Sequence, residues 1–442
     1  MNKYERYRDT GLTWINKVPE KWNLKKINAL FDERREKVSD TDYEALSVTK
    51  NGIFKQLDNV AKTNDGDNRK KVQRNDFVIN SRSDRKGSSG LSDFNGSVSL
   101  INIVLRIKKE YPRYMHYLLK SVPFQEEFYR NGKGIVADLW STNFQSMKSI
   151  ILPIPPIKEQ VQIANYLDWK INEIDRLIQI EKEKIKQLKI CKQKYIDSLI
   201  ETIDTVSQPL KSIFNFGKGL NITKENLGQK GIKCISYGEI HNEFFFSFSS
   251  NNTKLKKLEK TDSVVISKFA NLNKGDFIFA DTSEDLNGCG NFTFLEDDFI
   301  KIYAGYHTVV AKPIVEFDTK YLAYYFQSNK WRKQVKKAVK GIKVYSITQQ
   351  ILKSSKVQIP DDKIQKNIVN RADKFIEKIN CLTDIMESCI KALLDLKQSL
   401  ISEVVTGQID VRDITIPEYE KVAIADGEIE ETDEMEGKEY GN

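Results

Sequence analysis

Two stretches of the sequence decide its architecture: IPPIKEQVQIANYLDWKINEIDRLIQIEKEKIKQLKICKQKYI at Ile154–Ile196 and IPDDKIQKNIVNRADKFIEKINCLTDIMESCIKALLDLKQSLI at Ile359–Ile401. The second stretch lies 205 residues after the first, and 17 of the 43 aligned positions are identical without a gap. A long repeat that keeps one phase in both copies predicts a protein built as two similar halves. We expect each half to be a globular segment of about 150 residues followed by one long helix.

Both copies carry the apolar pattern of a coiled coil. Apolar residues recur at alternating steps of three and four, and proline, which is tolerated in the first turn of a helix, precedes each run. A helix of about 44 residues would be roughly 66 Å long, more than one globular core would bury, so we expect the two copies to pack against each other. The seam positions, which are also the candidate partner interface, are Ile171, Ile174, Ile178, Ile185, Leu188, Ile376, Ile379, Met386, Ile390 and Leu393.

The two globular segments share a predicted order of elements. A short apolar strand, a second strand and a helix are predicted around Asp76–Asn80 and Tyr114–Phe128, and again around Lys274–Phe279 and Thr319–Val339. The predicted fold class is α/β (α+β), with two similar globular domains separated by two long antiparallel coiled-coil helices in a pseudo-twofold arrangement. The predicted boundaries are 1–151 for the first globular domain with its amino-terminal segment, 152–206 for the central helix, 207–356 for the second globular domain, 357–410 for the distal helix and 411–442 for an acidic tail.

Charge is distributed unevenly along the chain. The whole protein carries a net +8, but residues 411–442 hold 11 acidic and 3 basic side chains, a net of −8, which leaves +16 on the remaining 410 residues. A basic body of this size is typical of proteins that bind polyanions, and equally of a solvated lysine-rich surface. The tail, rich in Glu and Gly, is predicted to be disordered.

The sequence gives no sign of membrane insertion and little sign of catalysis. No apolar run is long enough to cross a bilayer and the amino-terminal residues are too charged for a secretory signal, so we expect a cytoplasmic protein. Phosphate-binding, dinucleotide-binding and metalloprotease motifs are missing, and the many carboxylates leave a nuclease site open without indicating one. The five cysteines form no CxxC pair, and His116, His241 and His307 are far apart. We therefore predict no catalytic residues and no metal ligands.

Polar, basic loops recur in corresponding parts of the two globular segments. Arg, Lys, Asn and Ser are the side chains that contact phosphates and hydrogen-bond base edges in DNA. One such cluster is more often a solvated face, but clusters in both halves favour a DNA-binding role. The candidates are Arg69, Lys70, Lys71, Arg74, Arg82, Arg85, Lys86, Ser88 and Lys133 in the first segment, and Lys218, Asn221, Lys224, Lys268, Asn271, Lys274, Lys336, Lys337, Lys340 and Lys343 in the second.

Four stretches of sequence carry a resemblance to a known family. They are GLTWI at Gly11–Ile15, VPEKW at Val18–Trp22, LPIPPIKEQVQI at Leu152–Ile163 and LKQSLISEVVTGQID at Leu396–Asp410. In these stretches, and in the order of its parts, the chain resembles the specificity subunits of type I restriction-modification systems. The second helix copy departs from the family pattern, because Ile364 stands where the first copy has a glutamate.

The resemblance implies a function and a set of partners. Each globular segment would be a target recognition domain that binds one half of an asymmetric, bipartite DNA site, and the helices would be a spacer that fixes the gap between the half-sites. The chain itself would neither catalyse a reaction nor bind a cofactor. The implied partners are double-stranded DNA, two methyltransferase subunits that carry S-adenosylmethionine and modify adenine N6, and, where the system also restricts DNA, two nuclease subunits that use ATP and Mg²⁺.

Three other functions stay open at this point. The chain could be the specificity subunit of a methylation-only system, which neighbouring genes would reveal. It could be a coiled-coil adaptor without sequence-specific DNA binding, although an adaptor leaves the basic body unexplained. It could also be a stand-alone nuclease, which metal-dependent cleavage by the purified chain would reveal.

Overall fold

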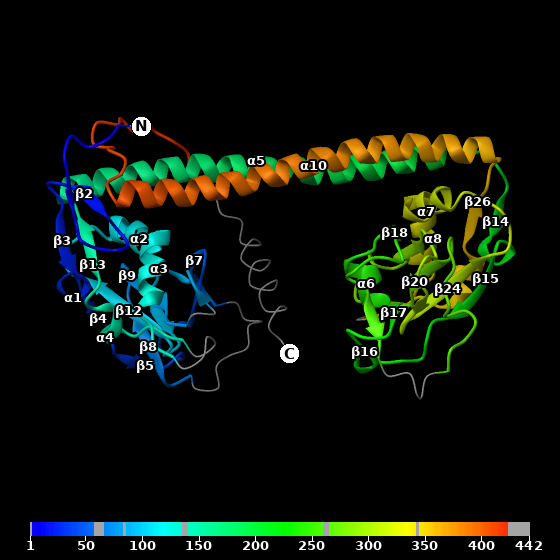
Figure 1. Ribbon diagram of the computed structural model, residues 1–442, viewed down its shortest axis with the longest axis horizontal. Helices are drawn as coiled ribbons and strands as arrows, with labels where there is room; N and C mark the ends of the chain where they lie inside the picture. The colour runs from blue at the N-terminus through cyan, green and yellow to red at the C-terminus, as the bar shows by residue number, and fades with distance from the viewer. Residues whose placement is uncertain are drawn as a thin grey trace. The chain divides into compact units, whose positions relative to one another are not determined.

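The protein forms two compact units, which the computed structural model describes for residues 2–56, 66–82, 85–134, 140–259, 265–341 and 344–422 (Figure 1). The first unit comprises Met1–Lys182 and Glu387–Asn442, and the second comprises Glu183–Met386. Each unit contains one globular α/β part together with portions of the two long helices, α5 (Ile157–Glu201) and α10 (Asp362–Val405). The chain therefore leaves the first unit along α5 and returns to it along α10.

The first unit is built on a four-stranded antiparallel sheet in the order β10-β9-β12-β4. A three-stranded sheet, β11-β8-β5, and the β6–β7 hairpin lie with it, while α2 and α3 cover the main sheet. The globular elements are β1 (Tyr7–Asp9), β2 (Lys17–Pro19), β3 (Asn23–Lys26), α1 (Ile27–Leu30), β4 (Phe31–Glu33), β5 (Lys37–Val38), β6 (Leu46–Thr49), β7 (Gly52–Lys55), β8 (Arg69–Val72), β9 (Asp76–Asn80), β10 (Ser89–Leu91), β11 (Gly96–Val98), β12 (Asn102–Ile107), α2 (Pro112–Lys120), α3 (Val122–Arg130), α4 (Phe144–Met147) and β13 (Ile151–Ile154).

The second unit repeats this plan around a five-stranded sheet, β15-β24-β20-β22-β18, and a four-stranded sheet, β16-β19-β17-β23. Its elements are β14 (Ser207–Pro209), η3 (Leu210–Ser212), β15 (Phe214–Lys218), η4 (Lys224–Asn226), β16 (Leu227–Gly228), β17 (Ile232–Ile235), α6 (Tyr237–Asn242), β18 (Ser247–Phe248), β19 (Lys256–Leu258), β20 (Phe277–Ala280), β21 (Thr282–Ser283), β22 (Phe292–Leu295), β23 (Ile302–Ala304), β24 (Thr308–Pro313), α7 (Thr319–Gln327), α8 (Asn329–Ala338), β25 (Tyr345–Ser346), α9 (Gln349–Ser354) and β26 (Lys356–Gln358).

Alternation along the central strands explains why each sheet has an apolar core on both faces. In β9, Phe77 and Ile79 pack into the large core under the helices, whereas Val78 between them joins a smaller core. In β20, Phe277 packs into the large core and Ile278 into a smaller one. Successive side chains of a strand point to opposite faces, so a strand that is apolar at every position must be covered on both sides.

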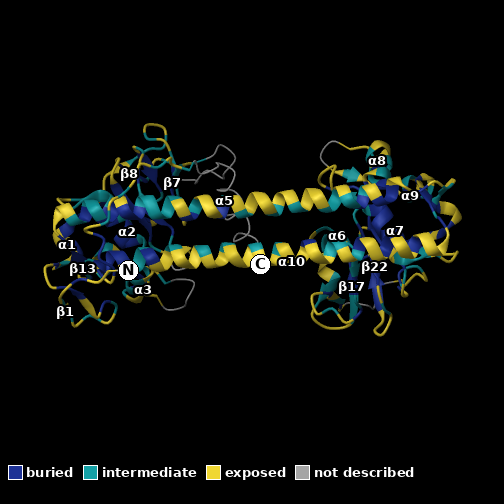
Figure 2. Ribbon diagram, turned by 90° about the horizontal axis from the view of Figure 1, so that it is seen from above, coloured by how far each residue is buried: buried dark blue, intermediate teal, exposed yellow. Residues whose placement is uncertain are grey.

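The two long helices pack on each other within each unit, which confirms the predicted fold class of two α/β domains with antiparallel coiled-coil helices. In the first unit, Lys397 of α10 holds both carboxylate oxygens of Asp175 of α5, at 2.7 and 2.9 Å. In the second unit, the rings of Tyr195 and Phe375 stack at 4.0 Å between centroids. Figure 2 shows buried residues of α5 and α10 gathering where each helix lies against globular elements. All ten seam positions are buried or half-buried.

A glutamine that is identical in the two helix copies binds each helix to its own globular domain. In the first unit the side-chain oxygen of Gln160 accepts the backbone N–H of Tyr111 at 2.8 Å, just ahead of α2. In the second unit Gln365 accepts the backbone N–H of Asp318 at 2.8 Å, just ahead of α7. Each glutamine amide is nearly or fully buried and also donates to a proline carbonyl of its own helix start. The repeated glutamine therefore serves the same junction twice.

A tyrosine–aspartate bond forms a second repeated junction. The hydroxyl of Tyr117 in α2 donates to Asp168 in α5, and the hydroxyl of Tyr324 in α7 donates to Asp373 in α10, both at 2.5 Å. Burial raises the pKa of both tyrosine hydroxyls well above the ordinary range, so they stay protonated and can donate. The spacing between Gln and Asp is therefore the same in both helices because these two side chains bind two fixed points of a globular domain.

Residues after α10 stay attached to the first unit. The amide of Gln162 donates to the carbonyls of Val411 and Ile414, at 2.9 and 2.7 Å, and Val411 is fully buried. The prediction of a disordered tail that begins at residue 411 is therefore wrong for residues 411–422, because their apolar side chains pack on the core. The rest of the predicted tail, 423–442, lies outside the described residues.

The glycine that ends α10 gives the first testable prediction. Gly407 has a left-handed backbone with φ of +74°, and a Cβ placed there would collide with the ring of Pro19 and approach Trp22 at 3.2 Å. We expect Gly407→Ala to lower the free energy of unfolding by about 2–4 kcal/mol, from backbone strain plus the collision. Urea denaturation of the purified protein measures the loss. Gly11→Ala is the matched control, because φ is +71° and nothing lies within 4 Å of the added carbon; equal losses would contradict the packing argument.

Candidate nucleic-acid interface

The central strand of each unit is preceded by the same tight turn. Asn75 and Gly275 adopt the left-handed conformation there, with φ of 68° and 85°, which asparagine and glycine tolerate best. One residue earlier, Arg74 and Lys274 are both exposed. Arg74 and Lys274, two candidate DNA contacts, are therefore counterparts at an offset of 200 residues. The helix repeat has an offset of 205 and would not have paired these two residues.

A buried aspartate holds each of these turns. Asp76 accepts the backbone N–H three residues earlier at 2.8 Å and the Nε of Arg34 at 2.7 Å. Asp276 accepts the corresponding N–H at 2.9 Å and the ammonium group of Lys312 at 2.5 Å. Burial raises the pKa of Asp276 above its ordinary value, against the opposing effect of Lys312. The exposed cation in each turn thus sits on a rigid support.

In the first unit two candidate residues, Arg82 and Lys133, meet with Ser141 at one place, which we name the first basic corner. Ser141 pairs by β-bridges with both Arg82 and Lys133, and its backbone exchanges hydrogen bonds with Lys133 at 2.9 and 3.1 Å. The next backbone N–H, that of Thr142, donates to the carbonyl of Ser81 at 2.9 Å. Arg82 and Lys133 are exposed, so the pairing brings two cations 51 residues apart in sequence to one surface.

The second unit assembles the same arrangement, the second basic corner, from Thr282, Lys340 and Ser346. Thr282 pairs with Ser346 in the β21–β25 ladder, and Lys340 forms a β-bridge with Ser346. Lys133 and Lys340 thus occupy equivalent places, and both are exposed. The position of Arg82 is taken by Thr282, so the frame is repeated while its side chains differ.

A half-buried chain of hydrogen bonds supports the second basic corner. Arg332 donates to the side-chain oxygen of Asn291 at 2.7 Å, and the Asn291 amide lies 2.9 Å from Nδ1 of His241. The other ring nitrogen of His241 lies 2.8 Å from the carbonyl of Thr282. The network assigns Nδ1 as the acceptor and Nε2 as the donor, since the carbonyl can only accept. His241 therefore holds β21 in place through both nitrogens of its ring.

The predicted DNA-contact residues divide by exposure. Twelve are exposed: Arg74, Arg82, Arg85, Lys86, Lys133, Lys218, Asn221, Lys224, Lys268, Lys274, Lys337 and Lys340. Four are half-buried: Lys70, Lys71, Asn271 and Lys336. Two are buried, namely Arg69 and Ser88, and Lys343 lies outside the described residues.

The structure corrects the prediction for Arg69. Its side chain is only 4 % exposed and donates to the hydroxyl and the carbonyl of Ser97 at 2.9 and 3.1 Å. Arg69 begins β8, the middle strand of its sheet, and is covered by the neighbouring strands and loops. Its place beside two lysines in the sequence suggested a surface cluster, but the guanidinium group serves packing instead. The prediction for Ser88 is corrected too, because Ser88 is only 5 % exposed and its backbone is bonded to Asn80 and Arg85.

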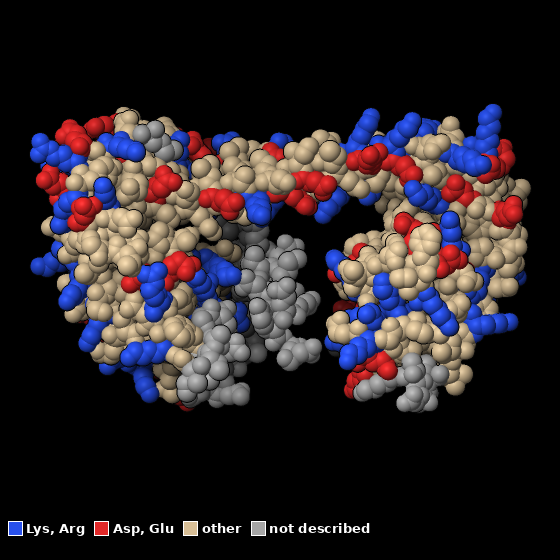
Figure 3. Space-filling model, in the orientation of Figure 1, with Lys and Arg blue, Asp and Glu red and all other residues tan. Residues whose placement is uncertain are grey.

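Figure 3 shows Lys and Arg side chains spread over the globular parts of the units, whereas acidic and basic side chains alternate along the long helices. Some cations of the first unit are already paired. Lys86 bonds Glu126, and its ammonium group lies 5.8 Å from the ring centre of Tyr129. Lys120 donates to three carbonyls, those of Lys50, Gly87 and Ser89, and burial lowers its pKa to about 8. Lys120 thereby fixes the strand that follows the loop of Arg85 and Lys86.

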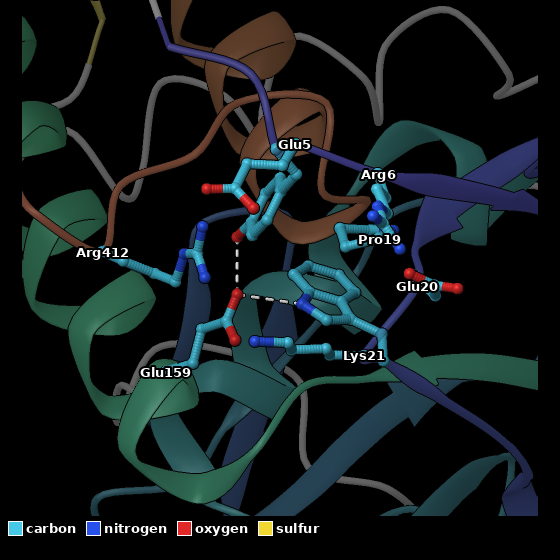
Figure 4. A pocket seen from close by; sticks show the side chains of 9 residues that line it. Glu5, Arg6, Pro19, Glu20, Lys21, Glu159 and Arg412 are labelled. Atoms are coloured by element: carbon cyan, nitrogen blue, oxygen red, sulfur yellow. Dashed lines mark hydrogen bonds between the residues drawn. The ribbon is translucent and has the colours of Figure 1, made fainter.

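A pocket of the first unit lies where the amino-terminal segment, the start of α5 and the residues after α10 meet (Figure 4). Glu159 points into it and accepts bonds from the hydroxyl of Tyr4 at 2.6 Å and the indole N–H of Trp22 at 2.9 Å. Acidic and basic side chains alternate around it. The second helix copy has Ile364 at this position, 44 % exposed. A glutamate is therefore present in the first copy because Tyr4 and Trp22 need a hydrogen-bond acceptor there.

This difference between the helix copies gives a prediction with a built-in control. Glu159→Ala leaves the buried hydroxyl of Tyr4 and the indole N–H of Trp22 without their acceptor, and we expect a loss of about 2–3 kcal/mol in unfolding free energy. Ile364→Ala at the equivalent position should change it by less than about 0.5 kcal/mol. Thermal denaturation of the two variants checks both values, and similar shifts in the two would show that Glu159 acts only through its place on the helix.

Two searches of the described residues bear on other classes of function. No group of three or more His, Cys, Asp or Glu side chains that could hold a metal ion occurs in that part of the chain. No helix within the same residues has the length and apolar character to cross a membrane.

Comparisons with known proteins agree with the repeated architecture. The chain matches the family model of the type I restriction modification DNA specificity domain over residues 19–189 and 203–389. A curated relative, the MjaVIII type I restriction enzyme specificity subunit of Methanocaldococcus jannaschii, is 22 % identical over 318 residues, which cover 67 % of this chain and 71 % of the relative. The two matched ranges hold most of the chain, one in each half. The protein therefore belongs to the family of type I restriction-modification DNA specificity subunits.

A solved structure supports the same fold. A chain from a study of complex assembly and conformational transition of the type I R-M system has a TM-score of 0.63 at 12 % identity, and the likeness covers 89 % of this chain and 99 % of that chain. The crystal structure of the HsdS subunit from Thermoanaerobacter tengcongensis has a TM-score of 0.47 at 13 % identity, over 89 % of this chain and 98 % of that chain. At such identities the first likeness concerns the fold alone, and nothing further rests on the second.

Proposed function

We propose that this chain is the DNA-reading subunit of a type I restriction-modification complex, with each globular domain binding one half of an asymmetric, bipartite site. The recognition domains would span 1–151 and 207–356, and the spacer helices 152–206 and 357–410. The observation that carries the proposal is the repeated basic corner, with Lys133 and Lys340 at equivalent exposed places of two similar domains. Two readers on one chain recognise two separate stretches of DNA, and their differing side chains make the two stretches differ in sequence.

The spacer and its outer surface suggest where partner subunits bind. Seam residues of α5 and α10 are covered within each unit, whereas Leu177, Ile190, Ile385 and Leu396 lie on the same helices with large exposed apolar side chains. Covering such side chains with another protein is favourable, because it removes apolar surface from water. We assign these side chains, two in each unit, to the binding of two methyltransferase subunits that carry S-adenosylmethionine and modify adenine N6.

The remaining partners and the compartment follow from the same proposal. Where the system restricts DNA, two nuclease subunits that use ATP and Mg²⁺ would join the complex, while this chain would bind no cofactor and catalyse no step. A role on chromosomal DNA would place the complex in the cytoplasm. In a methylation-only system the chain would do the same work without the nuclease subunits.

The test is a map of modified adenines. The chain is expressed with the neighbouring methyltransferase gene in a host free of adenine methylation, and modified positions are mapped across the genome. One bipartite motif with a fixed unspecified gap, modified on both strands, is the expected result. A stable complex with the methyltransferase that leaves the genome unmodified would favour the coiled-coil adaptor, the second candidate function, which accounts for the long helices but not for the basic corners.

The first basic corner gives a prediction about salt dependence. The plot of log affinity against log salt concentration has a negative slope, to which each phosphate contact contributes about −0.9. Losing two contacts in Arg82→Ala with Lys133→Ala should therefore make the slope less negative by about 1.8. The double variant should also bind target DNA at least about tenfold more weakly at 0.1 M salt. Fluorescence anisotropy of the assembled complex with duplex DNA at several salt concentrations measures both. Lys17→Ala is the control, because this exposed lysine belongs to β2 and pairs with Asp9 at 3.8 Å; an equal change there would point to net charge alone.

A further inference from the structure

The paired central strands show which residues of the two units are counterparts. In the first unit Asn102 of β12 faces Asn80 of β9, and in the second Thr308 of β24 faces Ala280 of β20. Each pair ends its ladder. The strands β12 and β24 are each entered through a short turn, which we name the first tip (Ser99–Asn102) and the second tip (Gly305–Thr308).

The two tips are closed by the same kind of side-chain bond. The side chain of Asn102 donates to the carbonyl of Ser99 at 3.1 Å, and the hydroxyl of Thr308 donates to the carbonyl of Gly305 at 2.7 Å. In both, a polar side chain at the end of the turn bonds a carbonyl three residues earlier, a common way to close a tight turn. The two central residues of each tip, Leu100–Ile101 and Tyr306–His307, are therefore equivalent.

Each tip is tied to the basic corner of its unit. The backbone N–H of Ser81 donates to the carbonyl of Ile101 at 3.4 Å, and Ser81 immediately precedes Arg82 of the first corner. The backbone N–H of Asp281 donates to the carbonyl of His307 at 3.1 Å, and Asp281 immediately precedes Thr282 of the second corner. A surface that meets phosphates at the corner therefore presents the tip residues beside them.

The first tip is apolar at its exposed positions. Leu100 and Ile101 are each 37 % exposed, although they lie next to cationic side chains and outside the cores of the unit. Exposure of two large apolar side chains to water is unfavourable. Contact with the methyl group of thymine, the one apolar group in the major groove, would remove part of this surface from water.

The second tip carries hydrogen-bonding groups instead. His307 has a left-handed backbone with φ of 55°, and its side chain is 54 % exposed. Its Nδ1 lies 3.1 Å from one carboxylate oxygen of Asp281, which leaves the other carboxylate oxygen free to accept another bond. The rings of Tyr237 and Tyr306 pack edge-on around His307, at 5.4 and 5.8 Å between centroids. Backbone strain of this kind persists where the surroundings hold it, and it is concentrated at functional sites.

We propose that the two tips, with the residues bonded to them, read bases in the DNA major groove. In the first unit Leu100 and Ile101 contact thymine methyl groups. In the second unit Asp281, which is bonded to His307 of the tip, accepts a bond from the exocyclic amine of cytosine while His307 orients it. The proposal rests on the proposed function and adds to it which residues set the two half-site sequences. A carboxylate cannot bind the phosphates, because both groups are negative and both only accept hydrogen bonds. The exocyclic amine of cytosine donates, so it is a suitable partner for a carboxylate beside the corner. The equivalence of the tips accounts for one docking mode, and their different chemistry for two different half-sites.

The test compares motifs written by variants of the whole chain in its complex with the methyltransferase. Asp281→Asn exchanges a pure acceptor for a group that pairs with adenine, so the cytosine position of one half-site should change toward adenine, by at least about tenfold in relative methylation rate on duplexes that differ at that position. Leu100→Ala with Ile101→Ala should lower the preference for thymine over cytosine at a position of the other half-site by about tenfold. In each case the opposite half-site and the gap length should stay unchanged.

Two further variants keep the outcome clear if a substitution harms folding. Asparagine also tolerates the left-handed backbone, so His307→Asn should keep the turn. This variant should weaken discrimination only at the base that Asp281 reads. Ile314→Ala, also exposed but just past the opposite end of β24, should leave both half-sites unchanged. Unaltered half-sites in the tip variants, changes in both half-sites at once, or complexes that assemble but methylate no duplex would each overturn the proposal. A wild-type complex that writes no bipartite motif would instead mean that the proposed function itself has failed.

Discussion

Removing one turn from each spacer helix is expected to shorten the unspecified gap of the DNA target by one or two base pairs and to leave both half-site sequences intact. Four residues of helix span about 6 Å, and base pairs are about 3.4 Å apart along the duplex axis. Counting seven residues from the Asp175–Lys397 pair along each helix places Gln179–Lys182 of α5 opposite Ile390–Leu393 of α10. Deleting both segments moves Ile185 and Met386 onto vacated seam positions, so the coiled coil can close again.

The spacer variant is checked by mapping modified adenines after coexpression with the methyltransferase. Replacing Gln179–Lys182 by four alanines is the control, because it removes the same side chains from α5 while it keeps the helix length and should leave the gap unchanged. A change in either half-site sequence would mean that the helices take part in base reading. An unchanged gap in the deletion variant would mean that DNA bending, and not helix length, sets the distance between half-sites.

The elements that the sequence could predict are those whose signal is local and periodic. The seam from Ile171 to Leu188 follows from the three-four spacing of apolar residues, because a helix places such residues on one side. The gapless repeat likewise predicts two similar halves, and the structure adds a reason for single identities. Gln160 and Asp168 recur as Gln365 and Asp373 because each pair binds the same two points of a globular domain.

The globular site was harder to predict, since its members meet through strand pairing that has no fixed spacing. Lys133 and Arg82 reach one corner only because both pair with Ser141. The counterparts of the two units are also hidden by loops of different length: Phe77 corresponds to Phe277 at an offset of 200, but Asn102 corresponds to Thr308 at 206. Sequence reasoning therefore missed both tips.

Composition misled the prediction in one further place. The tail was expected to be disordered from its average charge, but the acidic residues are concentrated toward its end, while Val411, Ile414 and Ile416 recur among its first residues. These three pack on the core of the first unit. A window of six residues would have shown an apolar segment that the average over the whole tail concealed.

Loss of the aspartate before the central strand of the second unit should be among the most destabilising single changes. Asp276→Ala leaves the largely buried ammonium group of Lys312 with only the carbonyl of Asn271 as a partner, and it frees a turn that carries the exposed Lys274. Removing one member of a buried ion pair typically costs about 3–5 kcal/mol, a large share of the total stability of a domain. We expect this loss in urea denaturation, together with weaker DNA binding by the assembled complex, because the turn no longer holds its cation in place.

A double variant separates the missing charge partner from the missing packing. Asp276→Ala with Lys312→Met removes both charges and keeps the length of the apolar stem, so it should recover about half or more of the lost stability, since no uncompensated buried cation remains. DNA binding should stay weak in the double variant, because the turn still lacks the acceptor that closes it. If the double variant were as unstable as the single one, the aspartate would act through its backbone bond alone. If DNA binding recovered with stability, the turn would serve the fold and not the placement of Lys274.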